Sequence, residues 1–129
     1  MGSPKGFLKV KRGEGGIPDQ AGRCLDCGTP FCNWACPLGN YIPEWNDEAY
    51  LSHFEHAYRL LASTNNLPEI TGRLCPALCE FSCVLGINYE PVTIRENELF
   101  IIETAFKKGW VVPRCPKNRS GKLVAVVGS

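Results

Sequence analysis

Several features of membrane, exported and nucleic-acid-binding proteins are missing from this sequence. No apolar run approaches the roughly 20 residues that a membrane span needs. The N-terminal stretch MGSPKGFLKVKRGEG contains no apolar core for a signal peptide. The formal net charge is only +1, which gives no electrostatic footprint for nucleic acid. We therefore expect a cytoplasmic protein that binds neither membranes nor nucleic acids.

The length and composition of the chain predict one small globular domain. Its 129 residues can build a modest core but are too few for two full domains. Hydrophobic residues make up 44% and charged residues 21%, values of an ordinary folded protein.

Cysteine is the residue that the chain has in excess. Eight cysteines without an export signal indicate metal ligands rather than disulfides, because cytosolic thiols are kept reduced. Disulfides between cysteines two or three residues apart would also be strained. Zinc is the stronger alternative, since Cys24, Cys27, Cys32 and Cys36 could close one tetrahedral site. Two zinc sites, however, would need two sets of four donors.

Seven of the cysteines form two blocks. Residues 24–37 read CLDCGTPFCNWACP, and residues 75–83 read CPALCEFSC. Such short gaps let several thiolates converge on one metal–sulfur centre without an extended core. The final Cys-Pro of the first block resembles the bacterial ferredoxin run, in which the fourth cysteine binds a second cluster. The pattern thus predicts two clusters, for which seven cysteines are one ligand short of eight.

The rest of the sequence predicts a mostly helical fold. Apolar periodicity indicates a helix over residues 43–62 and a shorter one over residues 66–72. The four-residue intervals between Cys75, Cys79 and Cys83 predict that these cysteines share a helical face, and one turn of helix would present two of the thiolates to one centre.

The best-specified helix is expected over residues 93–108. Thr93 and Glu96 form a capping-box pattern at its start. Gly109, after two lysines, is a stop signal at its end.

The C-terminal part has a different composition. Residues 113–122 read PRCPKNRSGK, which is typical of a linker, and we expect its Cys115 to be a free thiol. Residues 123–129 form an apolar, β-branched run that ends at a glycine, as in the opening strand of a Rossmann dinucleotide-binding unit. Gly128 would then be the first cofactor-binding glycine. We expect a helical cluster domain with an N-terminal arm at residues 1–112, a linker, and the start of a truncated FAD/NAD(P)-binding domain.

Long strings of the chain resemble the N-terminal iron–sulfur domain of the glutamate synthase small (β) subunit. They are CGTPFCNWACPLGNYIPEWND, PEITGRLCPALCEFSC and PVTIRENELFIIETAFKKGW. The resemblance covers about residues 5–129, essentially the whole chain. It extends more distantly to dihydropyrimidine dehydrogenase and to related NAD(P)H-dependent flavin oxidoreductases.

The resemblance implies a mostly α-helical domain of the alpha-helical ferredoxin type, wrapped around two 4Fe-4S clusters. By the family pattern, one cluster would be ligated by Cys24, Cys27, Cys32 and Cys83, and the other by Cys36, Cys75, Cys79 and Glu98. No such role falls on Cys115.

The resemblance also implies a function. In that family the small subunit oxidises NADPH at an FAD and passes electrons through its clusters to the large subunit, which reduces 2-iminoglutarate to glutamate. The expected partners are therefore the large subunit and the chain's own flavin domains. We expect the chain to be part of an oxidoreductase and to hold no catalytic residue itself. A structural zinc module and the iron–sulfur domain of a related flavin oxidoreductase are the alternatives.

Overall fold

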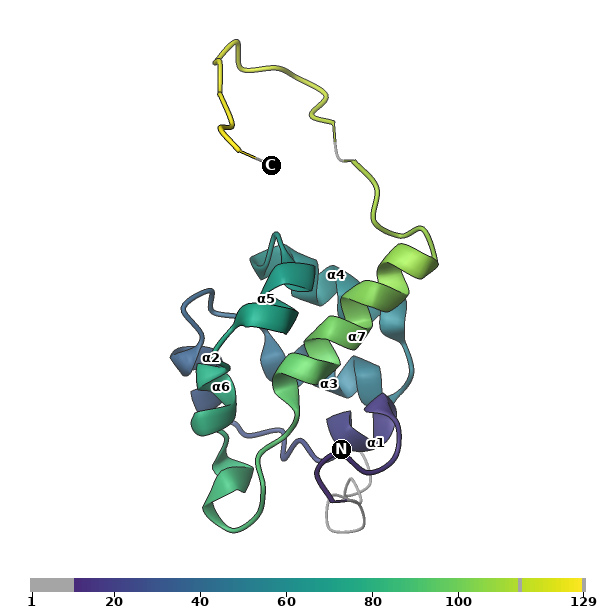
Figure 1. Ribbon diagram of the computed structural model, residues 1–129, viewed down its shortest axis with the longest axis vertical. Helices are drawn as coiled ribbons and strands as arrows, with labels where there is room; N and C mark the ends of the chain where they lie inside the picture. Colours follow the sequence, from purple (N-terminus) through teal and green to yellow (C-terminus); the bar gives the residue numbers. More distant parts are fainter. Residues whose placement is uncertain (1–10, 114, 129) are drawn as a thin grey trace.

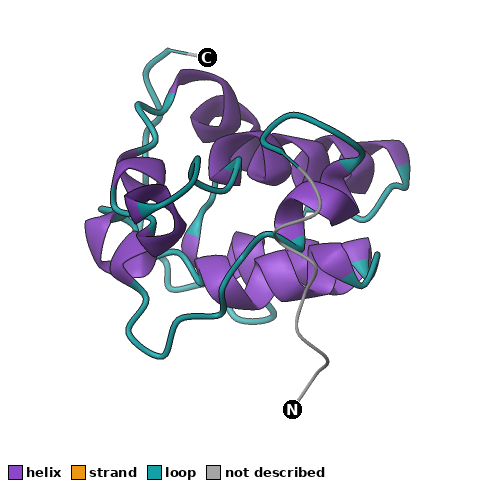
Figure 2. Cartoon of the chain, turned by 90° about the horizontal axis from the view of Figure 1, so that it is seen from below, coloured by secondary structure: helices purple, strands orange, loops and turns teal. Residues whose placement is uncertain are grey.

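The computed structural model describes residues 11–113 and 115–128, and helices dominate it (Figures 1 and 2). In chain order they are α1 (Ile17–Ala21), α2 (Phe31–Ala35), α3 (Ile42–Tyr50), α4 (Phe54–Thr64), α5 (Pro68–Leu74), α6 (Leu78–Phe81), the 3-10 turn η1 (Val84–Ile87) and α7 (Ile94–Lys107). The described residues contain no β-strand. The prediction of a mostly helical fold is confirmed.

The hydrophobic core lies where α1, α3 and α4 pack against α7. Trp45 of α3 and Leu61 of α4 are fully buried there, as are Ile101 and Ala105 of α7. The second half of the fold is smaller. In it α2 packs on α6 and α5 packs on α7 (Figure 1), which brings both cysteine blocks together beside the core.

The helix predicted over residues 43–62 is broken in two. α3 ends at Tyr50, and Ser52 adopts a left-handed conformation with a φ of 62°. The amide of His53 then donates to the carbonyl of Glu48 at 2.8 Å, and that of Ser52 to Ala49 at 3.1 Å. These two bonds form a Schellman motif, which ends the helix. The prediction of one continuous helix was wrong. It failed because neither a glycine nor a proline marks this break in the sequence.

The helix predicted over residues 93–108 is confirmed as α7, but the predicted capping box is wrong. The Thr93 hydroxyl does not cap the helix; it donates instead to Oδ1 of Asn97 at 3.0 Å. The start of α7 is capped from outside, because the amide of Arg95 donates to Oε1 of Glu80 at 2.9 Å. At the other end Gly109 has a φ of 71°, as the expected stop signal requires.

The second block of cysteines does not share a helical face. Cys75 follows α5, Cys79 lies within α6, and Cys83 precedes η1. Ala77 is left-handed with a φ of 56° and turns the chain between the first two elements. The three cysteines therefore come from three different elements, and the prediction that they share a helical face was wrong.

The C-terminal segment leaves the helical body (Figure 1). The structure has no strand at the expected position, and Leu123 and Val127 are 100% and 98% exposed. A strand needs a neighbouring strand to accept its hydrogen bonds, and the described residues provide none. Gly128 has a φ of 91° and no neighbour within 4 Å of a built Cβ. The domain boundaries stay a prediction.

Candidate metal centre

Four cysteines line one cavity beside the core. Cys24 and Cys27 come from the loop after α1, Cys32 from the first turn of α2, and Cys83 from the residue before η1. Apart from Asn46, the other residues that line the cavity are apolar and include Ile42, Leu85 and Val92. Thiolates are soft ligands that favour iron–sulfur clusters, zinc and copper(I). The cavity therefore combines four soft donors with a low-polarity wall.

The loop that carries the first two cysteines is shaped by its backbone. The amide of Cys24 donates to the carbonyl of Ala21 at 3.0 Å, which continues the turn at the end of α1. Asp26 is left-handed with a φ of 53°, a conformation that aspartate tolerates better than most residues. This turn bends the chain so that Cys24 and Cys27 both reach the cavity.

The thiols of this first group are close enough to affect one another. Burial, and after it the neighbouring Cys24, raises the pKa of Cys32 to about 12, with smaller contributions from Cys83 and Cys27. Burial, and then Cys83, also raises the pKa of Cys27. Without a cation these sites favour neutral thiols, and a bound metal would be needed to hold them as thiolates.

A second group of donors surrounds Cys79. Burial, and after it the carboxylate of Glu80, raises the pKa of Cys79 to about 12, with smaller contributions from Cys36, Cys75 and Glu98. Cys36 comes from the end of α2, Cys75 from the end of α5, and Glu98 from α7. The packing of α2 on α6 and of α5 on α7 brings these elements together. Cys36, Cys75 and Glu98 are thus near enough to Cys79 to affect its pKa, and their role as a second ligand set stays a prediction.

Glu98 is held in a buried, hydrogen-bonded position. Only 7% of the residue is exposed. Its Oε1 accepts a hydrogen bond from Nδ2 of Asn65 at 3.1 Å and another from the hydroxyl of Thr71. Burial raises its pKa, and the hydrogen bond from Thr71 opposes this shift. Both hydrogen bonds fall on Oε1, so within the described residues Oε2 stays available for a metal.

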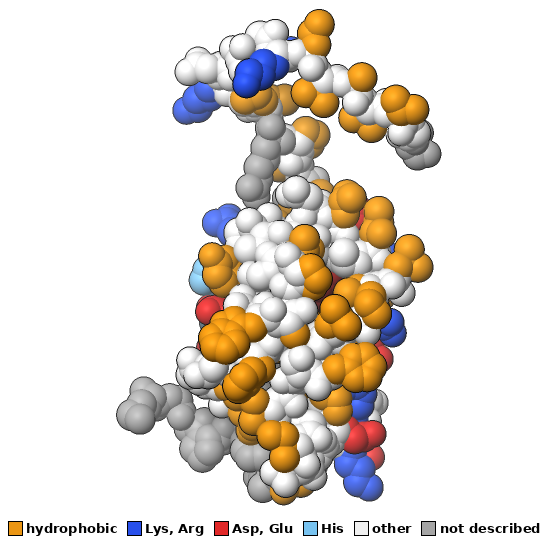
Figure 3. Space-filling view, turned by 90° about the vertical axis from the view of Figure 1, so that its left-hand side faces the viewer, with side chains coloured by type: hydrophobic (Ala, Val, Ile, Leu, Met, Phe, Trp, Pro, Cys, Tyr) orange, Lys and Arg blue, Asp and Glu red, His pale blue; other side chains and the backbone are white. Residues whose placement is uncertain are grey.

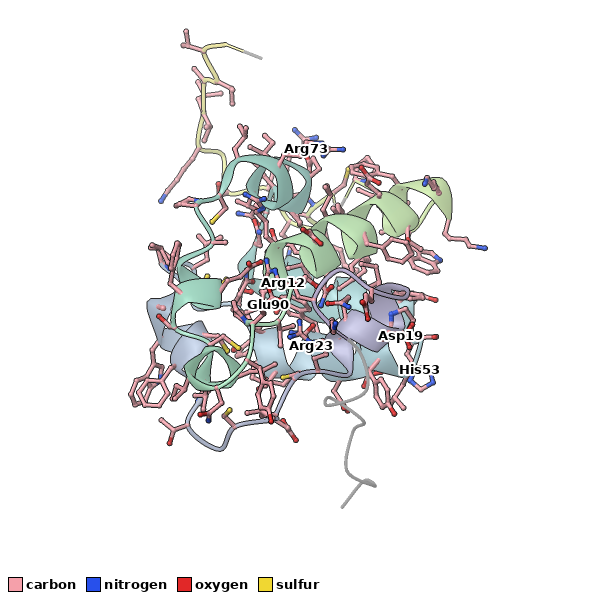
Figure 4. All side chains as sticks on the ribbon, turned by 60° about the horizontal axis from the view of Figure 1, so that its bottom comes forward. Arg12, Asp19, Arg23, His53, Arg73 and Glu90 are labelled. Carbon is pink, nitrogen blue, oxygen red and sulfur yellow. The ribbon has the colours of Figure 1, made fainter. Side chains whose placement is uncertain are left out.

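Two arginines tie the first cysteine loop to the chain that follows the second block. Arg23 is 3% exposed and donates to the carbonyls of Glu90 at 2.6 Å and Pro91 at 3.1 Å. Arg12 donates to the same Pro91 carbonyl at 2.8 Å and pairs with Glu80 at 2.6 Å. Figure 4 shows Arg12, Arg23 and Glu90 close together in this region. Burial, and then the charge of Arg12, lowers the pKa of Arg23. The carbonyls of Glu90 and Pro91 hold the Arg23 guanidinium in place.

Sequence reasoning did not find the polar residues that support the donors. Asn65 lies between α4 and α5, Thr71 lies within α5, and Arg23 directly precedes Cys24. Asn46 lies on the buried side of α3 and lines the first cavity. The one available signal was a polar residue among apolar core positions, as in the pair Trp45 and Asn46. It does not reveal what the side chain contacts.

Cys115 lies apart from both groups of donors. Cys115 is exposed in the segment that leaves the helical body. Across residues 11–113 and 115–128, no three His, Cys, Asp or Glu side chains converge closely enough to hold a single metal ion.

None of the helices within residues 11–113 and 115–128 is both long and apolar enough to cross a membrane.

The face of the molecule near both groups is rich in exposed apolar side chains. Figure 3 shows hydrophobic side chains across this side of the helical body. Trp34 of α2 is 69% exposed and Phe81 of α6 is 85% exposed. These two helices also carry Cys32 and Cys79, so apolar surface lies directly outside the donor groups.

Comparison with known families matches residues 8–110 to the model described as dihydropyrimidine dehydrogenase domain II, 4Fe-4S cluster. The chain belongs to this family. The match covers both cysteine blocks and α7. The chain is thus a helical iron–sulfur domain, as its resemblance to such domains predicted.

Curated relatives agree with this assignment. The chain is 59% identical over 113 residues to the glutamate synthase [NADPH] small chain of Mycobacterium tuberculosis, covering 88% of this chain and 23% of the relative. It is 42% identical to the Bacillus subtilis protein of the same name, covering 100% of this chain and 32% of the relative. It is 47% identical to the glutamate synthase [NADH] of Schizosaccharomyces pombe, covering 95% of this chain and 6% of the relative. The chain thus spans less than a third of each of these relatives, and the predicted resemblance to the glutamate synthase small subunit is confirmed.

Proposed function

We propose that this chain is the electron-transfer domain of a glutamate synthase small subunit and holds two 4Fe-4S clusters. The first would be bound by Cys24, Cys27, Cys32 and Cys83, and the second by Cys36, Cys75, Cys79 and Glu98. When bound, such clusters take up and release single electrons. The observation that carries the proposal is the gathering of eight donors into two groups of four, one lining a cavity and one around Cys79.

The donors suit clusters better than zinc. A cubane binds each of its four ligands through a different iron, so these ligands stand farther apart than four ligands of one zinc ion. The described residues offer four-donor groups but no convergence on a single ion. A carboxylate in the second group would make one iron distinct, because oxygen is a harder ligand than sulfur.

The rest of the proposal concerns the longer protein that the relatives represent. In it, an FAD that oxidises NADPH would supply the electrons, and the large subunit would use them to form glutamate. The names of the bacterial relatives, glutamate synthase [NADPH] small chain, support NADPH and a second, larger chain. The exposed apolar run at residues 123–127 would pair as a strand within the flavin domain, followed by Gly128 at the cofactor.

Anaerobic purification with metal analysis tests the proposal. We expect about eight irons and eight acid-labile sulfides per chain, together with broad visible absorption near 400 nm. A zinc-loaded, colourless protein without labile sulfide would establish the structural zinc module instead. About four irons would leave only one of the two proposed clusters.

A further inference from the structure

Asn46 carries a buried hydrogen-bond donor that has no partner. The residue lies in the middle of α3 and is fully buried. Its Oδ1 accepts a hydrogen bond from Nδ2 of Asn97 at 2.8 Å. Its own Nδ2 has no acceptor within the described part of the chain. A buried amide N–H is costly to leave unpaired, so this atom indicates a missing acceptor.

The orientation of the Asn46 amide is set by a short relay on α7. The Thr93 hydroxyl donates to Oδ1 of Asn97 at 3.0 Å, which turns Nδ2 of Asn97 toward α3. That nitrogen in turn donates a hydrogen bond to Oδ1 of Asn46. The Nδ2 group of Asn46 is therefore the free end of the relay.

The same asparagine lines the cavity of the first cysteine group. Apart from the four cysteines, every other side chain that lines this cavity in the described residues is apolar. Apart from backbone carbonyls, the acceptors available to Nδ2 of Asn46 within the cavity are therefore the thiolates themselves or the sulfides of a bound cluster. Both are weak but usable acceptors for an amide N–H.

We propose that Nδ2 of Asn46 donates a hydrogen bond to a sulfur of the first cluster and thereby raises its reduction potential. The inference rests on the proposed function, because it requires a cluster at Cys24, Cys27, Cys32 and Cys83. A donor next to sulfur stabilises the reduced state, which carries one more negative charge, and such hydrogen bonds are among the factors that set cluster potentials. Asn97 directly precedes Glu98, so neighbouring residues of α7 would serve the two clusters.

Two substitutions remove the donor in different ways. Asn46→Asp keeps an oxygen that accepts from Asn97 and replaces only the NH2 group, whereas Asn46→Leu removes the donor without adding charge. We expect both to lower the potential of the first cluster in a redox titration followed by electron paramagnetic resonance. The expected change in the reduced-to-oxidised ratio is at least tenfold, about 59 mV for a one-electron couple. The second cluster should keep its potential.

Thr64→Val is the matched control. It breaks the part-buried hydrogen bond from the Thr64 hydroxyl to Oδ1 of Asn40, and neither residue lines the first cavity, so the potential of the first cluster should stay unchanged. Unchanged potentials in iron-loaded Asn46→Leu would overturn the inference. So would a shift in Asn46→Asp alone, since the added charge would then account for it.

An experiment on the unaltered chain guards against variants that fail to fold. Asparagine labelled with 15N in the side chain can be incorporated by cell-free synthesis. We expect a 15N hyperfine coupling between Nδ2 of Asn46 and the reduced first cluster. The Nδ2 groups of Asn33 and Asn65 should not give this coupling, because they are bonded to other partners. Absence of this coupling in a chain with eight irons would overturn the hydrogen bond alone. A chain without iron or sulfide would overturn the proposed function as well.

Discussion

Cys32 lies in α2 and Cys36 directly follows it, only four residues away, yet the two belong to different groups of donors. Cys32 lines the first cavity, whereas Cys36 lies near Cys79 and contributes to its raised pKa after burial and Glu80. Residues four apart on a continuous helix share a face. α2 ends at Ala35, however, and Cys36 has an extended backbone with a ψ of 118°. The end of the helix therefore directs the fourth cysteine of the block toward the second group.

The first prediction follows from this position of Cys36. Cys36→Ser should lower the iron content from about eight to about four per chain, because one cluster loses a ligand and the serine hydroxyl is a poor substitute. Cys115→Ser is the matched control, since Cys115 is exposed and lies outside both groups. Iron and sulfide analysis of both variants checks the prediction. Equal iron loss in the two would show that Cys36 is no ligand.

The second prediction concerns the close approach of α5 to α7 at Gly72. A Cβ built on Gly72 would lie 2.9 Å from Cβ and 3.0 Å from Cα of Leu99. Gly72→Ala should therefore force the two helices apart and lower the free energy of unfolding by about 1–3 kcal/mol. Urea unfolding of the iron-loaded chain measures this change.

A glycine with open space around it provides the control for Gly72. A Cβ on Gly28 meets no atom within 4 Å, so Gly28→Ala should leave the free energy of unfolding within about 0.5 kcal/mol of the original. If Gly72→Ala proved equally harmless, the close contact with Leu99 would not constrain the packing of α5.

Local patterns in the sequence predicted the elements whose determinants are themselves local. The short gaps within the cysteine blocks indicated an iron–sulfur domain, and Gly109 marked the end of α7 because a left-handed residue there favours glycine. In each case the residues that decide the structure lie within a few positions of one another.

The features that could not be predicted depend on residues far apart in the chain. Ser52 is left-handed without being glycine, since α4 must fold back against α3. The cap on α7 comes from Glu80 rather than from the nearby Thr93. The contact between Asn46 and Asn97 joins residues 51 positions apart. Nothing in a local pattern identifies such partners.

The third prediction concerns this cap. Glu80 accepts from the amide of Arg95 at 2.9 Å and pairs with Arg12 at 2.6 Å, with 13% of its side chain exposed. Glu80→Ala should lower the free energy of unfolding by about 1–2 kcal/mol, because the start of α7 loses its cap. Glu55→Ala removes only the exposed pair with Arg59, which is worth about 0.3–0.5 kcal/mol. Losses of equal size in thermal or urea unfolding would show that Glu80 does not cap α7.

The last prediction concerns Glu98 as the eighth ligand. Its carboxylate is buried near Cys79, and its Oε1 is held by Asn65 and Thr71. Glu98→Ala should change the electron paramagnetic resonance spectrum of the second cluster. It should also shift the reduction potential of that cluster by about 59 mV or more, a tenfold change in the reduced-to-oxidised ratio. The first cluster should stay unchanged. Glu103→Ala, on the same helix but at an exposed position paired with Arg73, should alter neither cluster. Unchanged redox titrations of both clusters in Glu98→Ala would exclude Glu98 as a ligand.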